Sequence, residues 1–217
     1  MEDIATPANE VALTDKDIFR RIWTTPRLVF RFLNEYEYDN HVRILLVLSG
    51  VANALGSASS RNLGSKMSLT GVLVSCVLGG VIFNWITYYI YAALISWTGG
   101  RLKARGGIDA IVRVLAYSSI PTAVSLLFVI PQIAIYGNEV FKSHGNMTSA
   151  GLMPNIFVWA SVFIEGILGL WSIVLCVIGI SEVQGLSIGK AILNMLIPIA
   201  ILVVAILLIV AVIYLIH

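Results

Sequence analysis

The stretch AILNMLIPIAILVVAILLIVAVIYLI fills residues 191–216 and contains no charged side chain. An α-helix crosses a hydrocarbon core of about 30 Å with roughly 20 mostly apolar residues. The stretch is longer than this minimum, so it predicts a membrane-spanning helix.

Four more apolar segments precede it, at about residues 42–58, 69–97, 108–136 and 155–180. They are continuous apolar runs and lack the alternation that is typical of a membrane β-barrel strand. The second and third are longer than a bilayer requires, so they should tilt or project beyond it. The sequence therefore predicts an all-α fold, a polytopic bundle of five transmembrane helices over residues 42–217, preceded by amphipathic interfacial helices.

The composition agrees with this class. Of the 217 residues, 58% are hydrophobic and only 12% are charged, about half of the roughly 25% that a soluble globular chain carries. The net charge of +2 is too small to indicate a nucleic-acid partner. Cys76 and Cys176 lie inside apolar runs and are expected in opposite leaflets, too far apart for a disulfide. A soluble enzyme, a nucleic-acid binder and a disulfide-stapled secreted module are therefore excluded.

The first 41 residues differ from the rest. Residues 1–13 are acidic without periodic apolar positions, and we expect a disordered tail. Residues 14–41 predict two short amphipathic helices, the first capped by Thr14 with Asp17 in the capping-box position. The second begins at Pro26 after Thr25. Two interpretations stay open: these helices lie in the membrane interface, or they pack beneath the bundle.

The basic residues predict the orientation, because cytoplasmic flanks are rich in Lys and Arg. With five spans, the opposite side holds only Arg61, Lys66 and Lys142. The N-terminal side holds eleven: Lys16, Arg20, Arg21, Arg27, Arg31, Arg43, Arg101, Lys103, Arg105, Arg113 and Lys190. We therefore expect a cytoplasmic N-terminus and an outside C-terminus in a plasma (inner) membrane.

Several polar residues fall near the middle of the membrane. Asn84, Ser118, Ser119 and Glu165 are the candidates for one polar cluster in the bundle interior. Pro121 removes a backbone donor and frees a carbonyl near Tyr117. A carboxylate at this depth must be protonated or hydrogen-bonded. Two interpretations stay open: Glu165 binds a proton or a cation, or its side chain forms a hydrogen bond that joins two helices.

Small residues recur at helix-packing spacing in two spans. They are Gly71, Ser75 and Gly79 in the second, and Gly169, Ser172, Cys176 and Gly179 in the fourth. Such faces let backbones approach closely. We expect tight packing there, within one chain or between copies.

The cytoplasmic interface gathers another polar and aromatic set. It consists of Tyr88, Tyr91, Trp97, Arg113, Glu182, Gln184 and Asn194. Trp and Tyr are typical anchors at this depth, and Arg113 is placed to form an ion pair with Glu182. Two interpretations stay open: these residues anchor the helices in the membrane interface and pair with one another, or they form a site for a partner or a lipid headgroup.

Known catalytic and metal-binding motifs are absent. The sequence has no HExxH motif, phosphate-binding glycine loop, Cys/His metal spacing or nucleophile elbow, and His41, His144 and His217 are isolated. We expect no catalytic residue, no metal and no cofactor.

Five motifs resemble those of the Yip1 domain family, most closely its bacterial members. They are TPRLVF (25–30), WITYY (85–89), AYSSIP (116–121), LWS (170–172) and GISEVQGLSIGKA (179–191). The resemblance implies that Tyr117, Pro121 and Trp171 are family motif positions. Ala116 departs from the Gly of eukaryotic members, and their acidic cytoplasmic motifs are missing. Their binding of lipidated small GTPases is therefore not carried over.

These observations predict a non-enzymatic integral membrane protein that organises membrane or assists a membrane protein complex. The expected partners are membrane lipids and a membrane protein or a second copy of the chain, and no nucleic acid. The alternative is a small carrier or channel with a polar mid-membrane site around Glu165.

Overall fold

The computed structural model describes residues 13–143, 145 and 151–216. The expected tail, residues 1–13, lies almost wholly outside this part. The α-helices of the described residues are α1 (Asp15–Arg21), α2 (Pro26–Glu35), α3 (Val42–Ser60), α4 (Leu69–Arg101), α5 (Ile108–Ser118), α6 (Ile120–Val124), α7 (Leu126–Tyr136), α8 (Leu152–Gln184) and α9 (Ile188–Ile216). Two short 3-10 helices, η1 (Leu63–Ser65) and η2 (Gly137–Phe141), lie in the loops.

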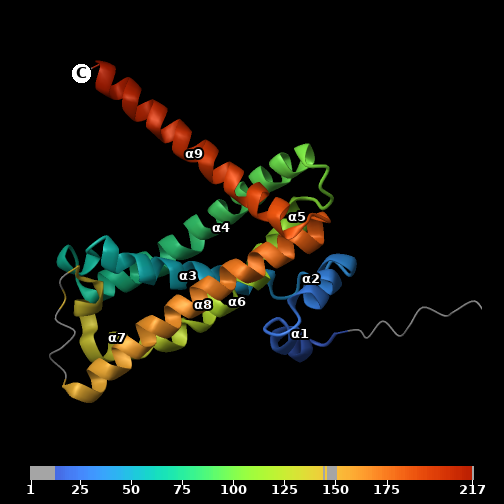
Figure 1. Ribbon diagram of the computed structural model, residues 1–217. Helices are drawn as coiled ribbons and strands as arrows, with labels where there is room; N and C mark the ends of the chain where they lie inside the picture. Colours follow the sequence, from blue (N-terminus) through green and yellow to red (C-terminus); the bar gives the residue numbers. More distant parts are fainter. Residues whose placement is uncertain (1–12, 144, 146–150, 217) are drawn as a thin grey trace, which may run out of the picture.

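Five helical segments are long and apolar enough to cross a membrane. They are Val42–Ser60, Leu69–Arg101, Ile108–Phe141, Leu152–Gln184 and Ile188–Tyr214. This confirms the all-α polytopic fold. In Figure 1, α9 contacts the bundle near its start and then leans away from it, and its side chains from Ile199 to Tyr214, apart from position 205, are exposed. Because these exposed side chains are almost all apolar, they suit contact with lipid.

The third span is built from three helices joined end to end. α5 stops at Ser118 and α6 starts one residue before Pro121, so the break falls where the proline was expected to cause it. A second break, at Ser125, was not expected. The hydroxyls of Ser119 and Ser125 donate to the carbonyls of Ala116 and Thr122, both at 2.7 Å. These bonds satisfy carbonyls near the two breaks.

The capping of α1 agrees with the sequence. The Thr14 hydroxyl accepts from the Asp17 backbone N–H at 3.4 Å, and the Asp17 carboxylate accepts from the Thr14 backbone N–H at 3.2 Å. The Thr14 hydroxyl also donates to the Asp17 carboxylate at 2.7 Å. This bond and the one from the Thr14 backbone N–H lower the pKa of the Asp17 carboxyl. The negative charge at the helix N-terminus also complements the helix dipole.

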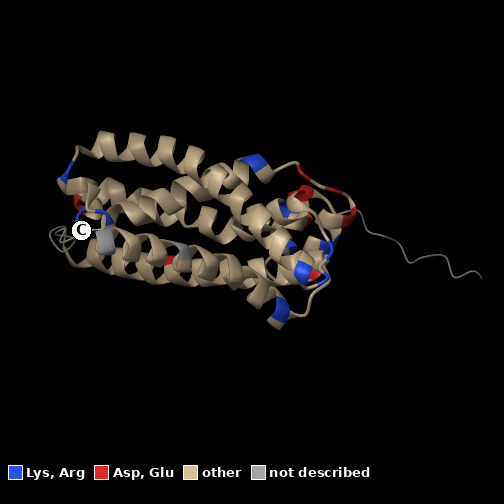
Figure 2. Cartoon of the chain, turned by 90° about the horizontal axis from the view of Figure 1, so that it is seen from above, with Lys and Arg blue, Asp and Glu red and all other residues tan. Residues whose placement is uncertain are grey.

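The N-terminal helices pack into the bundle. Ile18, Ile22, Val29, Phe30 and Leu33 are at most 1% exposed, in one core with residues of α3, α5 and α8. The packing interpretation therefore holds for these side chains, and Leu28 on the other face of α2 is 47% exposed. Figure 2 shows most charged segments gathered at this end of the bundle, which we call the N-terminal end. The opposite end, with the α3–α4 loop and η2, is the distal end.

Candidate functional site

Two ion pairs join the segment before α3 to the bundle at the N-terminal end. The Arg31 guanidinium contacts Glu182 on α8, and Arg113 Nε on α5 contacts Asp39 at 2.7 Å. The Arg31 Nη2–Glu182 Oε1 distance is 2.8 Å. The expected pairing of Arg113 with Glu182 is therefore wrong. Because α2 packs against α5 and α8, Arg31 on α2 reaches Glu182, and Asp39 in the segment between α2 and α3 reaches Arg113.

A buried amide network lies beside these pairs. Asn194 on α9, with no exposed surface, accepts from the Thr98 hydroxyl at 2.5 Å and donates to Gln184 Oε1 at 2.7 Å and the Ile95 carbonyl at 3.1 Å. The network joins α4, α8 and α9. Gln184 and Asn194 were both predicted at this interface, whereas Thr98 was missed because a lone threonine in an apolar helix carries no distinctive pattern.

The aromatic members of the predicted interface set lie around this network. Trp97 is 53% exposed, and its ring centroid lies 4.5 Å from the guanidinium carbon of Arg101, a cation–π contact. The Tyr91 hydroxyl donates to the Met195 carbonyl at 2.9 Å and so ties α4 to α9. These contacts match an anchoring role at the membrane boundary.

The mid-membrane residues do not form one hydrogen-bonded cluster. Asn84 on α4 donates to the Leu46 carbonyl on α3 at 2.9 Å. Glu165 on α8 accepts instead from Gln132 on α7 at 2.6 Å. Ser118 and Ser119 donate to carbonyls of their own helix. The expected cluster is therefore divided, because Asn84 and Glu165 each find a polar partner on a different neighbouring helix.

The family motif positions lie inside the bundle. Tyr117 is fully buried, and Pro121, in the first turn of α6, is also buried. Trp171 on α8 packs against the main core. Next to it in sequence, Ser172 accepts from the Thr122 backbone N–H at 3.2 Å, just after the break at Pro121. The motif positions therefore belong to the contact between the broken third span and α8.

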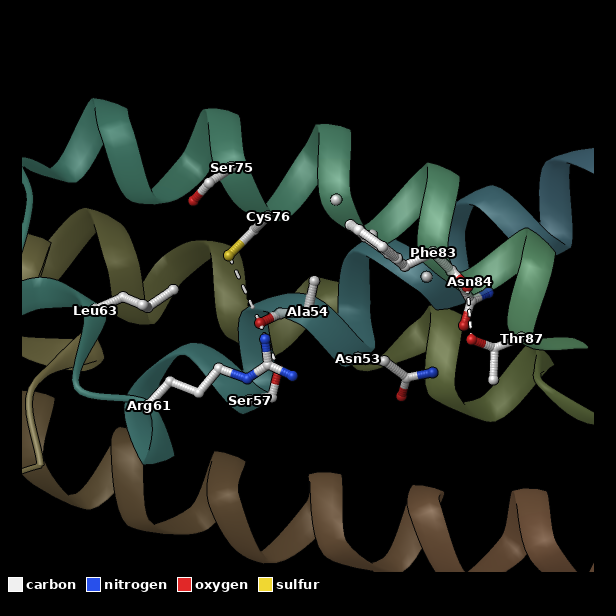
Figure 3. Close-up of a pocket in the computed structure, with 13 residues that line it drawn as sticks. Asn53, Ala54, Ser57, Arg61, Leu63, Ser75, Cys76, Phe83, Asn84 and Thr87 are labelled. Carbon is white, nitrogen blue, oxygen red and sulfur yellow. Dashed lines mark hydrogen bonds between the residues drawn. The ribbon is translucent and has the colours of Figure 1, made fainter. Parts of the chain in front are cut away.

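A groove of about 590 Å³ runs between α3 and α4 (Figure 3). Its residues are Gly50, Asn53, Ala54, Ser57, Arg61 and Leu63 on one side and Ser75, Cys76, Gly79, Gly80, Phe83, Asn84 and Thr87 on the other. The backbones of the two helices approach closely at Gly50 and Gly80, where a Cβ on Gly50 would lie 2.4 Å from the Gly80 carbonyl oxygen. Nearer the distal end, the Cys76 thiol lies 3.6 Å from the Ala54 carbonyl. Sequence reasoning missed this groove.

Among the described residues, no three His, Cys, Asp or Glu side chains lie close enough to hold a metal ion.

Comparison with known proteins gives one match. The family model described as Yip1 domain matches residues 14–209, which includes α1, α2, the first four spans and most of the fifth. Comparisons with curated proteins and with solved structures find no match.

Proposed function

Since the chain belongs to the Yip1 domain family, we propose that it is a non-enzymatic membrane protein that organises membrane or assists a membrane protein complex. The partner-binding surface is the exposed face of the N-terminal end. The observation that carries the proposal is the fixed position of α2, which is anchored by buried Val29, Phe30 and Leu33 and by the Arg31–Glu182 ion pair. Fixed helices present a defined surface without further ordering on binding.

The chemistry of this surface favours an anionic partner. Exposed basic residues cluster there: Lys16, Arg20, Arg27, Arg43, Arg101, Lys103, Arg105 and Lys190. Leu28 adds an exposed apolar side chain among them. Clusters of Lys and Arg beside membrane spans attract anionic lipid headgroups and acidic protein surfaces. The proposed partners are thus membrane lipids and an acidic segment of a membrane protein or of a second copy.

The proposal includes an orientation. The N-terminus and the basic surface face the cytoplasm, the C-terminus lies outside, and the membrane is a plasma (inner) membrane. The bias of eleven basic residues against three supports it, because basic flanks are retained on the cytoplasmic side. Reporter tags on the two termini should report opposite sides, and both termini on one side would contradict the orientation.

Site-directed photocrosslinking in cells tests the partner-binding surface. A photoreactive residue at Leu28 should capture a defined membrane protein or lipid, whereas the same probe at Lys66, exposed at the distal end, should not. Arg27→Glu with Lys103→Glu should weaken the Leu28 adduct by reversing charge at the contact. Equal crosslinking from both probe positions, or none from Leu28, would contradict the proposed function.

A further inference from the structure

We propose that the groove between α3 and α4 binds one anionic phospholipid, with its phosphate on Arg61 and an acyl chain running along the groove toward Thr87. This site lies at the distal end, so it is independent of the partner-binding surface at the N-terminal end.

Arg61 supplies the charge for a phosphate. It follows the last residue of α3, and its guanidinium group points back into the groove (Figure 3). Arg61 has no ion pair with any residue of the described chain, and Glu139 on η2, at the same end, is paired with Lys142. An arginine fork without an acidic partner matches the planar, two-point recognition of a phosphate.

The loop that carries Arg61 is fixed in place. The Asn138 side chain on η2 donates to the carbonyls of Gly64 at 2.7 Å and Met67 at 3.2 Å. The Ser143 backbone N–H donates to the Asn62 side chain at 3.2 Å. A Cβ on Gly64 would lie 2.6 Å from the Asn138 carbonyl oxygen, so the two loops approach as closely as glycine permits. Hydrogen bonds to Asn138 and Ser143 therefore hold the loop that carries Arg61 in place.

The length of the groove matches one acyl chain. On α4 it extends over thirteen residues, from Ser75 to Thr87, a rise of about 18 Å along the axis. This length is close to one leaflet of a hydrocarbon core of about 30 Å. A single extended acyl chain therefore fits along the groove.

The lining suits a chain that enters from the membrane. The hydroxyls of Ser57 and Ser75 donate to the Ala54 and Val72 carbonyls, at 3.1 and 2.9 Å. The Thr87 hydroxyl donates to the Phe83 carbonyl at 2.7 Å. Because these hydroxyl protons are already used, the three side chains present no free donor to a hydrocarbon chain, and Asn53 adds an exposed amide to the same groove. The unpaired charge at the mouth and the occupied hydroxyls along the groove together fit an amphiphile.

Native mass spectrometry of the full chain in mild detergent, titrated with dioleoylphosphatidylglycerol, tests the site. The unchanged protein should retain one copy of this lipid, and more tightly than dioleoylphosphatidylcholine. Arg61→Gln should weaken retention of phosphatidylglycerol roughly tenfold, the size of one charge-assisted hydrogen bond. Lys66→Gln, which removes an exposed charge at the same end outside the groove, should change nothing.

A second pair of variants tests the acyl-chain path. Gly79→Leu adds a side chain inside the groove, where a Cβ meets only Phe83 at 3.8 Å, and should abolish retention. Gly166→Leu on α8, where a Cβ meets nothing within 4 Å, is the matched control and should retain the lipid. The proposal is overturned if Arg61→Gln and Lys66→Gln weaken binding equally, if Gly79→Leu keeps the lipid, or if sn-glycerol 3-phosphate displaces it. This last result would indicate a soluble-anion site.

Discussion

Arg113 and Asp39 form an ion pair whose two members differ in burial. The Arg113 side chain is 8% exposed and that of Asp39 is 66% exposed. Without its partner, a buried guanidinium stays desolvated with its charge uncompensated, whereas an exposed carboxylate is stabilised by water. The effect on stability should therefore depend on which member is removed.

Asp39→Ala should lower the free energy of unfolding by about 1–3 kcal/mol, because it leaves Arg113 buried and unpaired. Arg113→Met should cost less than about 1 kcal/mol, because its thioether fills the apolar site and Asp39 is hydrated. Unfolding in mixed dodecyl maltoside and SDS micelles measures both. Equal losses in the free energy of unfolding would mean that water solvates Arg113 as well as Asp39. Arg31→Ala leaves the Glu182 side chain, 17% exposed, without its partner, so its cost should lie between those of the other two variants.

Asn194 is the centre of the amide network that holds the first turns of α9. Replacing it with leucine leaves the Gln184 amide oxygen without its donor in a buried site, whereas the Thr98 hydroxyl keeps the Leu94 carbonyl as acceptor at 2.9 Å. We expect Asn194→Leu to cost about 1–2 kcal/mol and to increase hydrogen exchange in residues 188–200. Leu193→Ala, at a neighbouring position that is 51% exposed, should leave both measurements nearly unchanged. Unchanged exchange in Asn194→Leu would show that the network does not hold α9.

Among the helices, α3 and α4 make the closest contact, and a glycine on each permits it. Gly50 and Gly80 face each other: a Cβ on Gly50 would lie 2.4 Å from the Gly80 carbonyl oxygen and 2.7 Å from the Asn84 Cβ. These backbone and Cβ atoms move only with their helix. Gly50 and Gly80 also line the groove.

Gly50→Ala should separate α3 from α4 and lower the free energy of unfolding by about 1–3 kcal/mol. Gly56→Ala lies on the same helix with nothing within 4 Å of its Cβ, so it should be neutral or stabilise by up to about 1 kcal/mol through helix propensity. The difference between the two variants in the same micelle assay is the test. Equal stability would mean that the helices separate without cost.

The sequence predicts the spans better than their ends. Each apolar run must be helical in hydrocarbon because its backbone has no other hydrogen-bond partners. Hydropathy indicates which residues lie in the hydrocarbon core, however, and a helix can continue beyond that core. α4 therefore continues past the expected end at residue 97 to Arg101. α8 begins at Leu152 and ends at Gln184, beyond both ends of the expected span 155–180. α8 stops where Gly185 adopts a φ of +63°.

The packing contacts were less predictable than the spans. Of the small residues expected at helix contacts, Gly179 is one, since its Cβ would lie 2.5 Å from Val114. A Cβ on Gly169 meets nothing within 4 Å, and one on Gly79 meets only a neighbour on its own helix. The contact at Gly50 and Gly80 was missed, because spacing along one helix does not tell which face meets which neighbour. The pairing of Arg113 failed for the same reason.

In the whole molecule, the N-terminal segment packs against one end of the helix bundle and covers it. Phe30 is fully buried and lies against Gly179, whose Cβ would be 3.1 Å from its ring. The same segment provides the acid for Arg113 and the base for Glu182. The family match begins at residue 14, which fits a segment that belongs to the folded domain. Apolar packing and charge pairing therefore both depend on residues that precede the first span.

Deleting residues 1–40 should destabilise the entire bundle. The deletion uncovers the apolar surface beneath Val29, Phe30 and Leu33 and leaves the buried guanidinium of Arg113 without its partner, two of the costliest changes for a folded protein. We expect a lower unfolding temperature and aggregation on size-exclusion chromatography in dodecyl maltoside. Leu28→Ser, on the exposed face of α2, is the control and should behave as the full chain does. If the deletion unfolds at the temperature of the full chain, α1 and α2 are attachments to the membrane interface, and the bundle is stable without them.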